Sequence, residues 1–187
     1  MQKERSLELM EGRKGRSAGF TLIELMVALS LVALLLTVAI PSYQSLRQDQ
    51  MVKAATQAVY TDMMLLKSEA LKRNRNLQMI LFNSGTGNWC YRISIDGSCA
   101  SCNDTCSSIE GRKGVDASEF PGIILTGTYT ESSSQIRPIS FSPRRGTLPS
   151  GSITVSSSAA SMKVVTNNLG RVRTCAVSNL VGEVACN

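Results

Sequence analysis

The sequence predicts an α+β fold in which a long amino-terminal helix packs on an antiparallel β-sheet in a carboxyl-terminal head. An unbroken apolar run near the amino terminus is followed by apolar residues at helical spacing, which together predict the helix. Short β-prone runs separated by Gly, Ser, Asn and Pro then predict the sheet. The 187 residues are enough for one ordinary domain with an appendage.

The composition excludes most kinds of catalytic site. The chain has no histidine, which rules out a Ser-His-Asp triad, a Cys-His pair and a His-ligated metal. Aromatic residues are 5% of the chain, and the acidic residues show no paired arrangement suited to acid–base catalysis. We therefore expect a protein that is not an enzyme and that uses no cofactor, no metal and no small-molecule substrate.

The first element is a 21-residue apolar run over residues 20–40 that carries one charge, Glu24. At about 1.5 Å per residue a helix of this length is roughly 30 Å long, which is enough to cross the hydrocarbon core of a bilayer. Residues 1–19, before it, hold five basic and three acidic residues. A positive flank stays in the cytoplasm, so the rest of the chain is expected to face outward.

Two simpler interpretations of this run are a cleaved secretory signal and a plain membrane anchor. A secretory signal has its small residues after the apolar core, whereas Ser17, Ala18 and Gly19 precede it. A plain anchor does not explain Glu24, because a carboxylate inside a membrane helix costs about 2.5–3.5 kcal/mol on insertion scales. We therefore expect a partner that neutralises Glu24.

The segment Gly19-Phe20-Thr21-Leu22-Ile23-Glu24, followed by a long uncharged run, resembles the prepilin motif of type IV pilins and type II secretion pseudopilins. The resemblance implies a type IV pilin-like fold. It also implies that a membrane peptidase cleaves after Gly19 and removes residues 1–19 as a leader, or a shorter leader if translation starts at Met10.

The same resemblance assigns roles to three further residues. Phe20 becomes the new amino terminus and is N-methylated. Glu24 pairs with the amino-terminal charge of a neighbouring subunit, which costs far less than burying either charge alone. Pro41 matches the proline that follows the apolar segment in this family, where it kinks or loosens the helix.

Residues 20–41 are thus expected to form the transmembrane and filament-core part of a helix that continues as an amphipathic segment over residues 42–75. Apolar residues recur there at intervals of three and four, the spacing of one helix face. They are Val52, Ala55, Val59, Met63, Leu66 and Ala70. Asn74 or Asn76 is placed to cap the helix, which we expect to end near Arg73.

Residues 76–187 are expected to form the head. The β-prone runs within it cover residues 77–82, 89–95, 123–128, 136–141, 152–156, 162–166 and 171–177. A helix that covers a sheet of these strands gives a head of this size one hydrophobic core.

Six cysteines fall into two groups in the head. They are Cys90, Cys99, Cys102 and Cys106 in one loop region, and Cys175 and Cys186 near the carboxyl end. The first group also has spacing suited to zinc or to a redox-active pair. An outward-facing head meets oxidising conditions, however, so we expect structural disulfides. The first four cysteines allow three pairings, among which the sequence does not choose. Cys175 and Cys186 are expected to pair and to close a small hairpin-like loop.

The net charge of +6 is unevenly distributed along the chain. Residues 1–19 carry +2, residues 96–131 carry −4 and residues 137–187 carry +5. The carboxyl-terminal third is therefore a basic module with a possible anionic partner.

Within this module, Arg171 and Arg173 project from one face of a strand if Arg171 begins that strand, about 6.6–6.8 Å apart. Guanidinium groups so placed can hold successive phosphates by paired hydrogen bonds. Arg144, Arg145 and Lys163 lie in nearby turns or strands and can widen the basic surface.

On the residues alone, a simpler interpretation is a solvated strand whose arginines keep an edge from pairing. The run Gly170-Arg171-Val172-Arg173 nevertheless resembles the GRxR motif of FimT-type minor pilins, members of the GspH/FimT/FimU group. Residues 139–146 resemble the F-x-P-x-G segment of that group. The resemblance implies DNA binding in natural transformation through this motif and nearby basic residues.

The leading hypothesis is therefore a minor type IV pilin that takes part in pilus initiation or tip assembly and binds extracellular DNA without sequence preference. Its expected partners are other major and minor pilins, the prepilin peptidase/methyltransferase, the inner membrane and DNA. It is expected in the bacterial inner membrane with its head in the periplasm, and then in the pilus at the cell surface. The alternative is a structural protein without DNA binding, either a FimU-like tip connector or a GspH-like pseudopilin of type II secretion.

Overall fold

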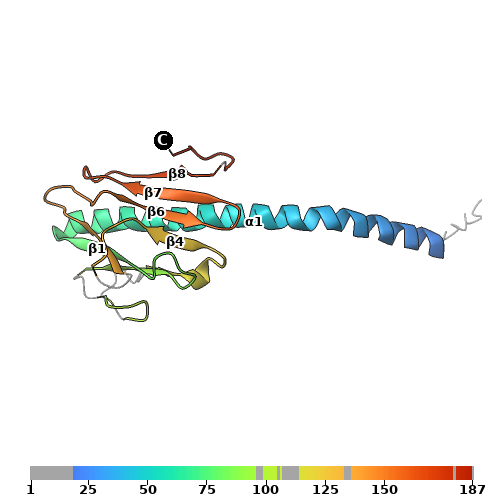
Figure 1. Ribbon diagram of the computed structural model, residues 1–187, viewed down its shortest axis with the longest axis horizontal. Coiled ribbons are helices and arrows are strands. Elements are labelled where there is room, and N and C mark those ends of the chain that lie inside the picture. The colour runs from blue at the N-terminus through green and yellow to red at the C-terminus, as the bar shows by residue number, and fades with distance from the viewer. Residues whose placement is uncertain are drawn as a thin grey trace, which may run out of the picture. The chain divides into compact units, whose positions relative to one another are not determined.

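A computed structural model of the chain describes residues 19–95, 99–104, 106, 114–132, 136–178 and 180–186. The chain divides into two compact units, Met1–Pro41 and Ser42–Asn187. The helix α1 (Leu22–Arg73) contributes to both (Figure 1). The expected leader lies outside the described residues except for Gly19.

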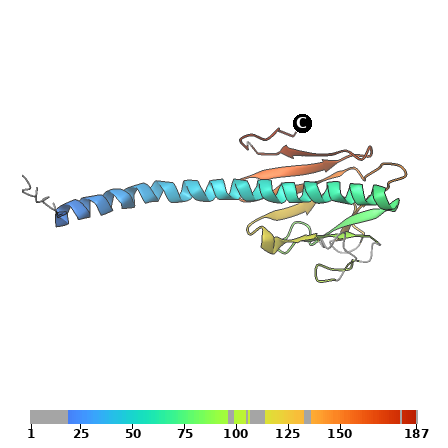
Figure 2. The same ribbon diagram turned by 180° about the vertical axis from the view of Figure 1, so that it is seen from behind.

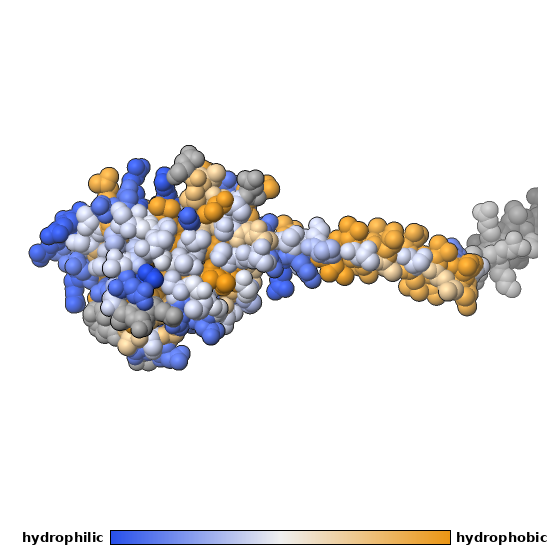
Figure 3. All heavy atoms as spheres, viewed as in Figure 1, coloured by the Kyte–Doolittle hydropathy of each residue, from blue (hydrophilic) through white to orange (hydrophobic). Residues whose placement is uncertain are grey.

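The first unit contains the apolar part of α1. Its side chains are exposed throughout, and the helix as a whole is long and apolar enough, by length and composition, to cross a membrane. Figure 3 shows apolar residues over the visible face of this segment. The hydroxyls of Ser30 and Thr37 donate to backbone carbonyls three residues earlier, so these polar side chains are satisfied within the helix. Pro41 lies inside α1, which continues without a break to Arg73.

In the second unit, α1 buries the stripe expected from its spacing. Val52, Val59, Met63 and Leu66 have no exposed surface, and Ala55 and Ala70 are buried with them. The helix ends as expected after Arg73, where Asn74 takes a positive φ of 48° and the amide of Arg75 donates to the carbonyl of Ala70.

The described part of the head holds a short 3₁₀ helix and eight strands in two antiparallel sheets. The strands are β1 (Leu77–Phe82), β2 (Cys90–Ser94), β3 (Gly114–Asp116), β4 (Ile124–Gly127), β5 (Ile136–Phe141), β6 (Gly151–Ser156), β7 (Ser161–Thr166) and β8 (Val172–Ala176). One sheet has the order β3-β2-β1-β5 and the other β4-β6-β7-β8. The 3₁₀ helix, η1 (Ala117–Glu119), follows β3.

The α+β prediction is confirmed, and each of the expected β-prone runs contains a strand whose ends lie within one or two residues of the prediction. Two features differ. The head has two sheets, because β5 pairs with β1 while β4 pairs with β6. Strand β3 was not expected, since three residues give no alternation to recognise; its pairing with β2 makes it a strand.

The hydrophobic core lies between α1 and the inner faces of both sheets (Figure 2). Trp89 is 1% exposed, and its indole Nε1 donates to the carbonyl of Ile123 at 2.7 Å. The hydroxyl of Tyr91 on β2 donates to the carboxylate of Asp62 on α1 at 2.7 Å, and both residues are buried. These hydrogen bonds join the helix and the loops to a core that is otherwise apolar.

All six cysteines are paired. Cys90 bonds to Cys102, Cys99 to Cys106, and Cys175 to Cys186, the pair that the sequence favoured. The structure thus selects one of the three pairings left open. Cys99 and Cys102, whose spacing suits zinc or a redox-active pair, are each bonded to a different cysteine and not to each other.

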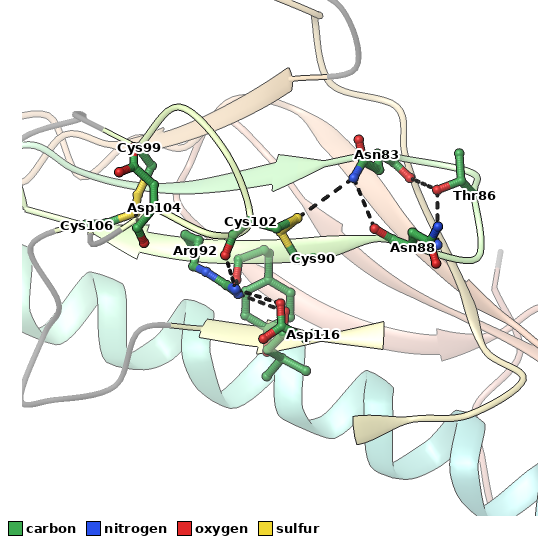
Figure 4. Close-up of a disulfide and its surroundings, with 12 residues drawn as sticks. Asn83, Thr86, Asn88, Cys90, Arg92, Cys99, Cys102, Asp104, Cys106 and Asp116 are labelled. Atoms are coloured by element: carbon green, nitrogen blue, oxygen red, sulfur yellow. Dashed lines mark hydrogen bonds and ion pairs between the residues drawn. A yellow bond between two sulfur atoms is a disulfide. The ribbon is translucent and has the colours of Figure 1, made fainter. Parts of the chain in front are cut away.

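A second, smaller cluster forms around these bonds on the outer face of β1 and β2. It contains Ile80, Phe82 and three of the cysteines. Arg92 lies beside it, 6% exposed, and its Nη2 contacts Asp116 at 2.6 Å and the carbonyl of Cys102 at 2.5 Å (Figure 4). A buried guanidinium thus connects β2, β3 and the disulfide loop on the outer face of β2, while Tyr91 and Ile93 of the same strand lie in the main core.

Candidate functional site

The prepilin-like motif occupies the start of α1. Gly19 and Phe20 precede the helix and are exposed, and Glu24 lies in its first turn. The Thr21 hydroxyl accepts a hydrogen bond from the amide of Glu24 at 3.2 Å, which is the contact of a helix N-cap. Thr21 therefore begins the helix, and the residues on either side of the expected cleavage point stay accessible.

The arginines of the GRxR-like segment lie at the start of β8. That strand begins at Val172, so Arg171 immediately precedes it instead of opening it as expected. Arg171 and Arg173 are both exposed, whereas Val172 between them packs against the core. Side chains therefore alternate between the two faces of the sheet from Arg171 onward, although the strand begins only at Val172. Both guanidinium groups point outward as a result.

Lys163 joins these arginines from the neighbouring strand. On β7 it is paired with Cys175, and Val165 is paired with Arg173. Lys163 and Arg173 are therefore diagonal neighbours on the outer face of the sheet, at a typical separation of about 7–8 Å. Lys163 is partly exposed.

The turn between β7 and β8 is held by Asn167. Its side-chain Oδ1 accepts hydrogen bonds from the amides of Leu169 at 3.1 Å and Arg171 at 3.0 Å. Its carbonyl accepts from the amide of Gly170, and its own amide donates to the carbonyl of Arg171. The backbone that carries Arg171 is thus fixed by several hydrogen bonds within five residues.

Gly170 connects this turn to a second basic turn. It has a φ of +69°, and a β-carbon at this position would lie 2.1 Å from the carbonyl oxygen of Gly146. Only glycine allows this contact. Lys67 on α1 also donates to the carbonyl of Gly170, at 2.6 Å, so the turn is anchored on two sides.

Gly146 ends the turn that carries Arg144 and Arg145, both exposed. Ser142 and Thr147 close that turn through a pair of backbone hydrogen bonds of 3.0 and 3.3 Å. The contact between Gly146 and Gly170 therefore brings the two turns together, although they are far apart in the sequence. We call the resulting set of side chains the basic surface: Arg144, Arg145, Lys163, Arg171 and Arg173.

The basic surface carries unbalanced positive charge. In the described part of the chain, none of its five side chains forms a salt bridge. In the described part of the head, the acidic residues that form salt bridges do so with other cations, for example Glu131 with Arg137 at 3.0 Å and Glu183 with Lys53 at 3.8 Å. Cations without acidic neighbours attract anions, and exposed arginines suit phosphate groups in particular.

Sequence reasoning identified the basic side chains but not what brings them together. The contact between Gly146 and Gly170, and the hydrogen bond from Lys67, join segments distant in the chain. The sequence feature that could have pointed to this contact is the glycine in each of the two motifs, Gly146 and Gly170. Nothing in the sequence set Arg137 apart from the other arginines, yet its guanidinium is bound to Glu131 and to the carbonyl of Tyr129.

Comparison with known proteins identifies the family. Residues 14–40 match the prokaryotic N-terminal methylation motif, and residues 55–170 match the family described as type II transport protein GspH. No curated protein sequence matches the chain significantly.

Two solved structures illustrate the similarity. The type IV minor pilin FimU of Pseudomonas aeruginosa shares 13% identity over 65% of this chain and 90% of its own, with a TM-score of 0.44. The minor pseudopilin EpsH of the type 2 secretion system of Vibrio cholerae shares 14% identity over 68% of this chain and 98% of its own, with a TM-score of 0.47. Because the family match covers more than half of the chain and follows an N-terminal methylation motif, this protein belongs to the GspH family of minor pilins and pseudopilins.

Proposed function

We propose that this GspH-family protein is a minor type IV pilin that takes part in pilus initiation or tip assembly and whose basic surface binds extracellular DNA. Binding of this kind serves DNA uptake in natural transformation. The observation that carries the proposal is the contact between Gly146 and Gly170, which sets Arg144 and Arg145 beside the turn that leads into Arg171 and Arg173. A purely solubilising set of arginines needs no such arrangement.

The proposed binding is independent of base sequence. Arginine and lysine side chains on a sheet face and two turns reach phosphates, and phosphate contacts carry no sequence information. Each phosphate contact releases condensed counterions, so affinity should fall steeply as salt rises. One subunit with five cations binds weakly, and several subunits in a filament bind more strongly through effective concentration.

The proposed location follows from the amino terminus. Before assembly the apolar part of α1 crosses the inner membrane with the head in the periplasm, and afterwards it lies in the filament core. The prepilin peptidase/methyltransferase cleaves after Gly19 and methylates Phe20. Glu24 then pairs with the amino-terminal charge of a neighbouring subunit, which offsets the cost of a buried carboxylate. In this role the protein is a substrate of that enzyme and catalyses nothing itself.

DNA binding is tested with the full chain, disulfides intact, in a non-ionic detergent. Arg171→Gln and Arg173→Gln, alone and together, are compared with Arg47→Gln, which removes an exposed arginine of α1 outside the basic surface. Duplex DNA affinity is measured at several salt concentrations. Each substitution in the basic surface should lower the slope of log affinity against log salt by about 0.9 for each phosphate that is no longer bound, and the control should leave it unchanged. Unchanged affinity in a folded double variant would exclude the proposed interface.

A second candidate is a structural role alone, as a tip connector or as the pseudopilin of a type II secretion system. The family description, type II transport protein, favours it. In that case the wild-type chain binds no DNA even at low salt, and deletion of the gene abolishes protein secretion or pilus formation. Retention of secretion together with loss of DNA uptake in the deletion strain would favour the pilin role.

A further inference from the structure

The turn between β7 and β8 presents a leucine beside the basic surface. Leu169 is 79% exposed, and it lies two residues before Arg171 and next to Gly170, against which the turn of Arg144 and Arg145 packs. A single exposed leucine is common on protein surfaces and by itself needs no explanation. A large apolar side chain two residues from Arg171, in a turn that meets the turn of Arg144 and Arg145, is less ordinary, because none of these arginines forms a salt bridge in the described part of the chain.

The backbone of Leu169 is held in place. Its amide and that of Arg171 donate to the same oxygen, Oδ1 of Asn167, at 3.1 and 3.0 Å. The side-chain oxygen of the preceding residue, Asn168, accepts from the Ser150 hydroxyl at 2.9 Å. Gly170 is fixed by Gly146 and by Lys67. The turn therefore presents the leucine and the arginine in a constant relation, so little conformational entropy is lost when both bind one ligand.

We infer that Leu169 packs against the face of a nucleobase while the neighbouring arginines hold the phosphates, so that Leu169 raises the affinity of the basic surface for DNA with unpaired, unstacked bases relative to its affinity for the duplex. The inference rests on the proposed function and names the class of DNA that the site takes. Bases offer an apolar face in single strands, at frayed ends and in gaps. Apolar side chains, leucine among them, insert between bases in other DNA-binding proteins.

Comparison of the gains and costs favours unpaired over paired DNA. In an intact duplex the base faces are stacked, and parting two base pairs costs about as much as burying one leucine side chain gains. In a single strand the cost is small, so most of the gain remains. Arginine–phosphate contacts favour the duplex instead, because its charge density is higher. The effect of Leu169 is therefore seen in the ratio of the two affinities.

The experiment uses the full chain with its disulfides intact in a non-ionic detergent. Affinities are measured for a single strand of about 20 nucleotides, longer than the site of a typical single-strand-binding module, and for the duplex of the same sequence. Both are measured at two salt concentrations. The variants are Leu169→Ala and Leu169→Trp. The control, Val181→Ala, shortens another exposed aliphatic side chain, 91% exposed, in the carboxyl-terminal loop.

We expect Leu169→Ala to lower single-strand affinity by about 3- to 10-fold and to change duplex affinity by less than about twofold. Leu169→Trp should raise single-strand affinity, because an aromatic ring stacks on a base more strongly than an aliphatic group. Neither substitution removes a charge, so the salt dependence should stay as in the wild type. Val181→Ala should leave both affinities unchanged.

Three outcomes would overturn the inference. If the wild-type chain binds DNA and Leu169→Ala keeps both of its affinities, the leucine has no contact with bases, while the proposed DNA binding stands. If Leu169→Ala weakens single-strand and duplex binding equally, the leucine only supports the turn. If the wild-type chain binds neither DNA, the proposed function fails and the inference fails with it.

Discussion

The carbonyl oxygen of Gly146 lies against the α-carbon of Gly170, so close that a β-carbon at residue 170 would come within 2.1 Å of it. Through this contact the turn of Arg144 and Arg145 meets the turn that leads into Arg171. Glycine is needed at residue 170 for two independent reasons, its φ of +69° and the absence of room. The charge of the basic surface therefore comes from its arginines and lysine, whereas the arrangement of its two turns depends on Gly146 and Gly170.

The first prediction is that Gly170→Ala weakens DNA binding although it removes no charge. The β-carbon would force the two turns apart, and the positive φ would add about 1–2 kcal/mol of strain. We expect a reduction in affinity similar to that of the Arg171→Gln and Arg173→Gln double variant, together with a lower Tm. The affinity is measured as for the arginine variants, and the Tm is measured by the fluorescence of the single tryptophan, Trp89, which is buried in the head.

Gly122→Ala is the matched control for this prediction. Gly122 has a φ of +80°, and nothing lies within 4 Å of a β-carbon built on it. Gly122→Ala should therefore introduce the backbone strain without a steric clash. Its Tm should fall, while its DNA affinity should stay unchanged. If Gly170→Ala binds DNA as tightly as Gly122→Ala, the junction of the two turns has no part in binding.

The sequence predicted most of the fold and the members of the basic surface, but not how they meet. Strand β6 alternates small or polar residues with Ile153 and Val155 because one face is buried, and this alternation is readable. In strand β2 the alternation shows Tyr91 and Ile93 as the inner face, but it does not show that the outer face is buried as well, because the disulfide cluster that covers it includes cysteines outside the strand. β3 and the contact between Gly146 and Gly170 depend on tertiary pairing, which no local pattern encodes.

The second prediction concerns the hydrogen bond from Tyr91 to Asp62. Its length is 2.7 Å and both residues are buried, so removal of the hydroxyl takes a donor from a carboxylate that water does not reach. Tyr91→Phe should lower the free energy of unfolding by about 1.5–3 kcal/mol, the range for hydrogen bonds to charged groups. Tyr43→Phe, at an exposed tyrosine of α1, should change it by less than about 0.5 kcal/mol. Equal effects of the two substitutions in Trp89 unfolding curves would contradict this account.

The third prediction is a pH dependence that comes from Glu69 near the end of α1. Hydrogen bonds from Lys72 at 2.7 Å and from Arg73 at 3.0 Å lower the pKa of the Glu69 carboxyl below its usual 4.5. A carboxyl whose pKa is lower in the folded state stabilises that state above the unfolded pKa, and the stabilisation is lost as pH falls through the folded pKa. The Tm of the wild type should therefore exceed that of Glu69→Gln near neutral pH.

This difference in Tm should shrink as pH falls below about 4.5, because protonated Glu69 loses its attraction to both cations. The comparison with Glu69→Gln cancels the titration of the other carboxyls, which both chains share. It is measured by Trp89 fluorescence from neutral pH down to about pH 3, below the usual pKa of a glutamate. Curves that stay parallel over this range would show that the two hydrogen bonds do not stabilise the folded head.

The last prediction separates the two roles assigned to the amino terminus. Thr21 caps α1, and Gly19 and Phe20 are exposed before it, so a change at Glu24 should leave cleavage possible. Glu24→Ala should therefore lose its leader, which mass spectrometry detects, yet fail to enter the filament. Gly19→Ala should keep its leader and stay in the membrane fraction.

Glu24→Ala is expected to be cleaved but not assembled because the carboxylate of Glu24 is needed only once the helix lies in the filament core. If Glu24 pairs as proposed, removing its carboxylate leaves the amino-terminal ammonium of the neighbouring subunit without a partner in an apolar core, and an uncompensated buried charge costs several kcal/mol. The matching test is Glu24→Gln, which keeps the size of the side chain and removes the charge. If Glu24→Gln assembles as the wild type does, the side chain is needed for its shape and not for neutralisation; if Glu24→Ala assembles as well, the pairing does not occur.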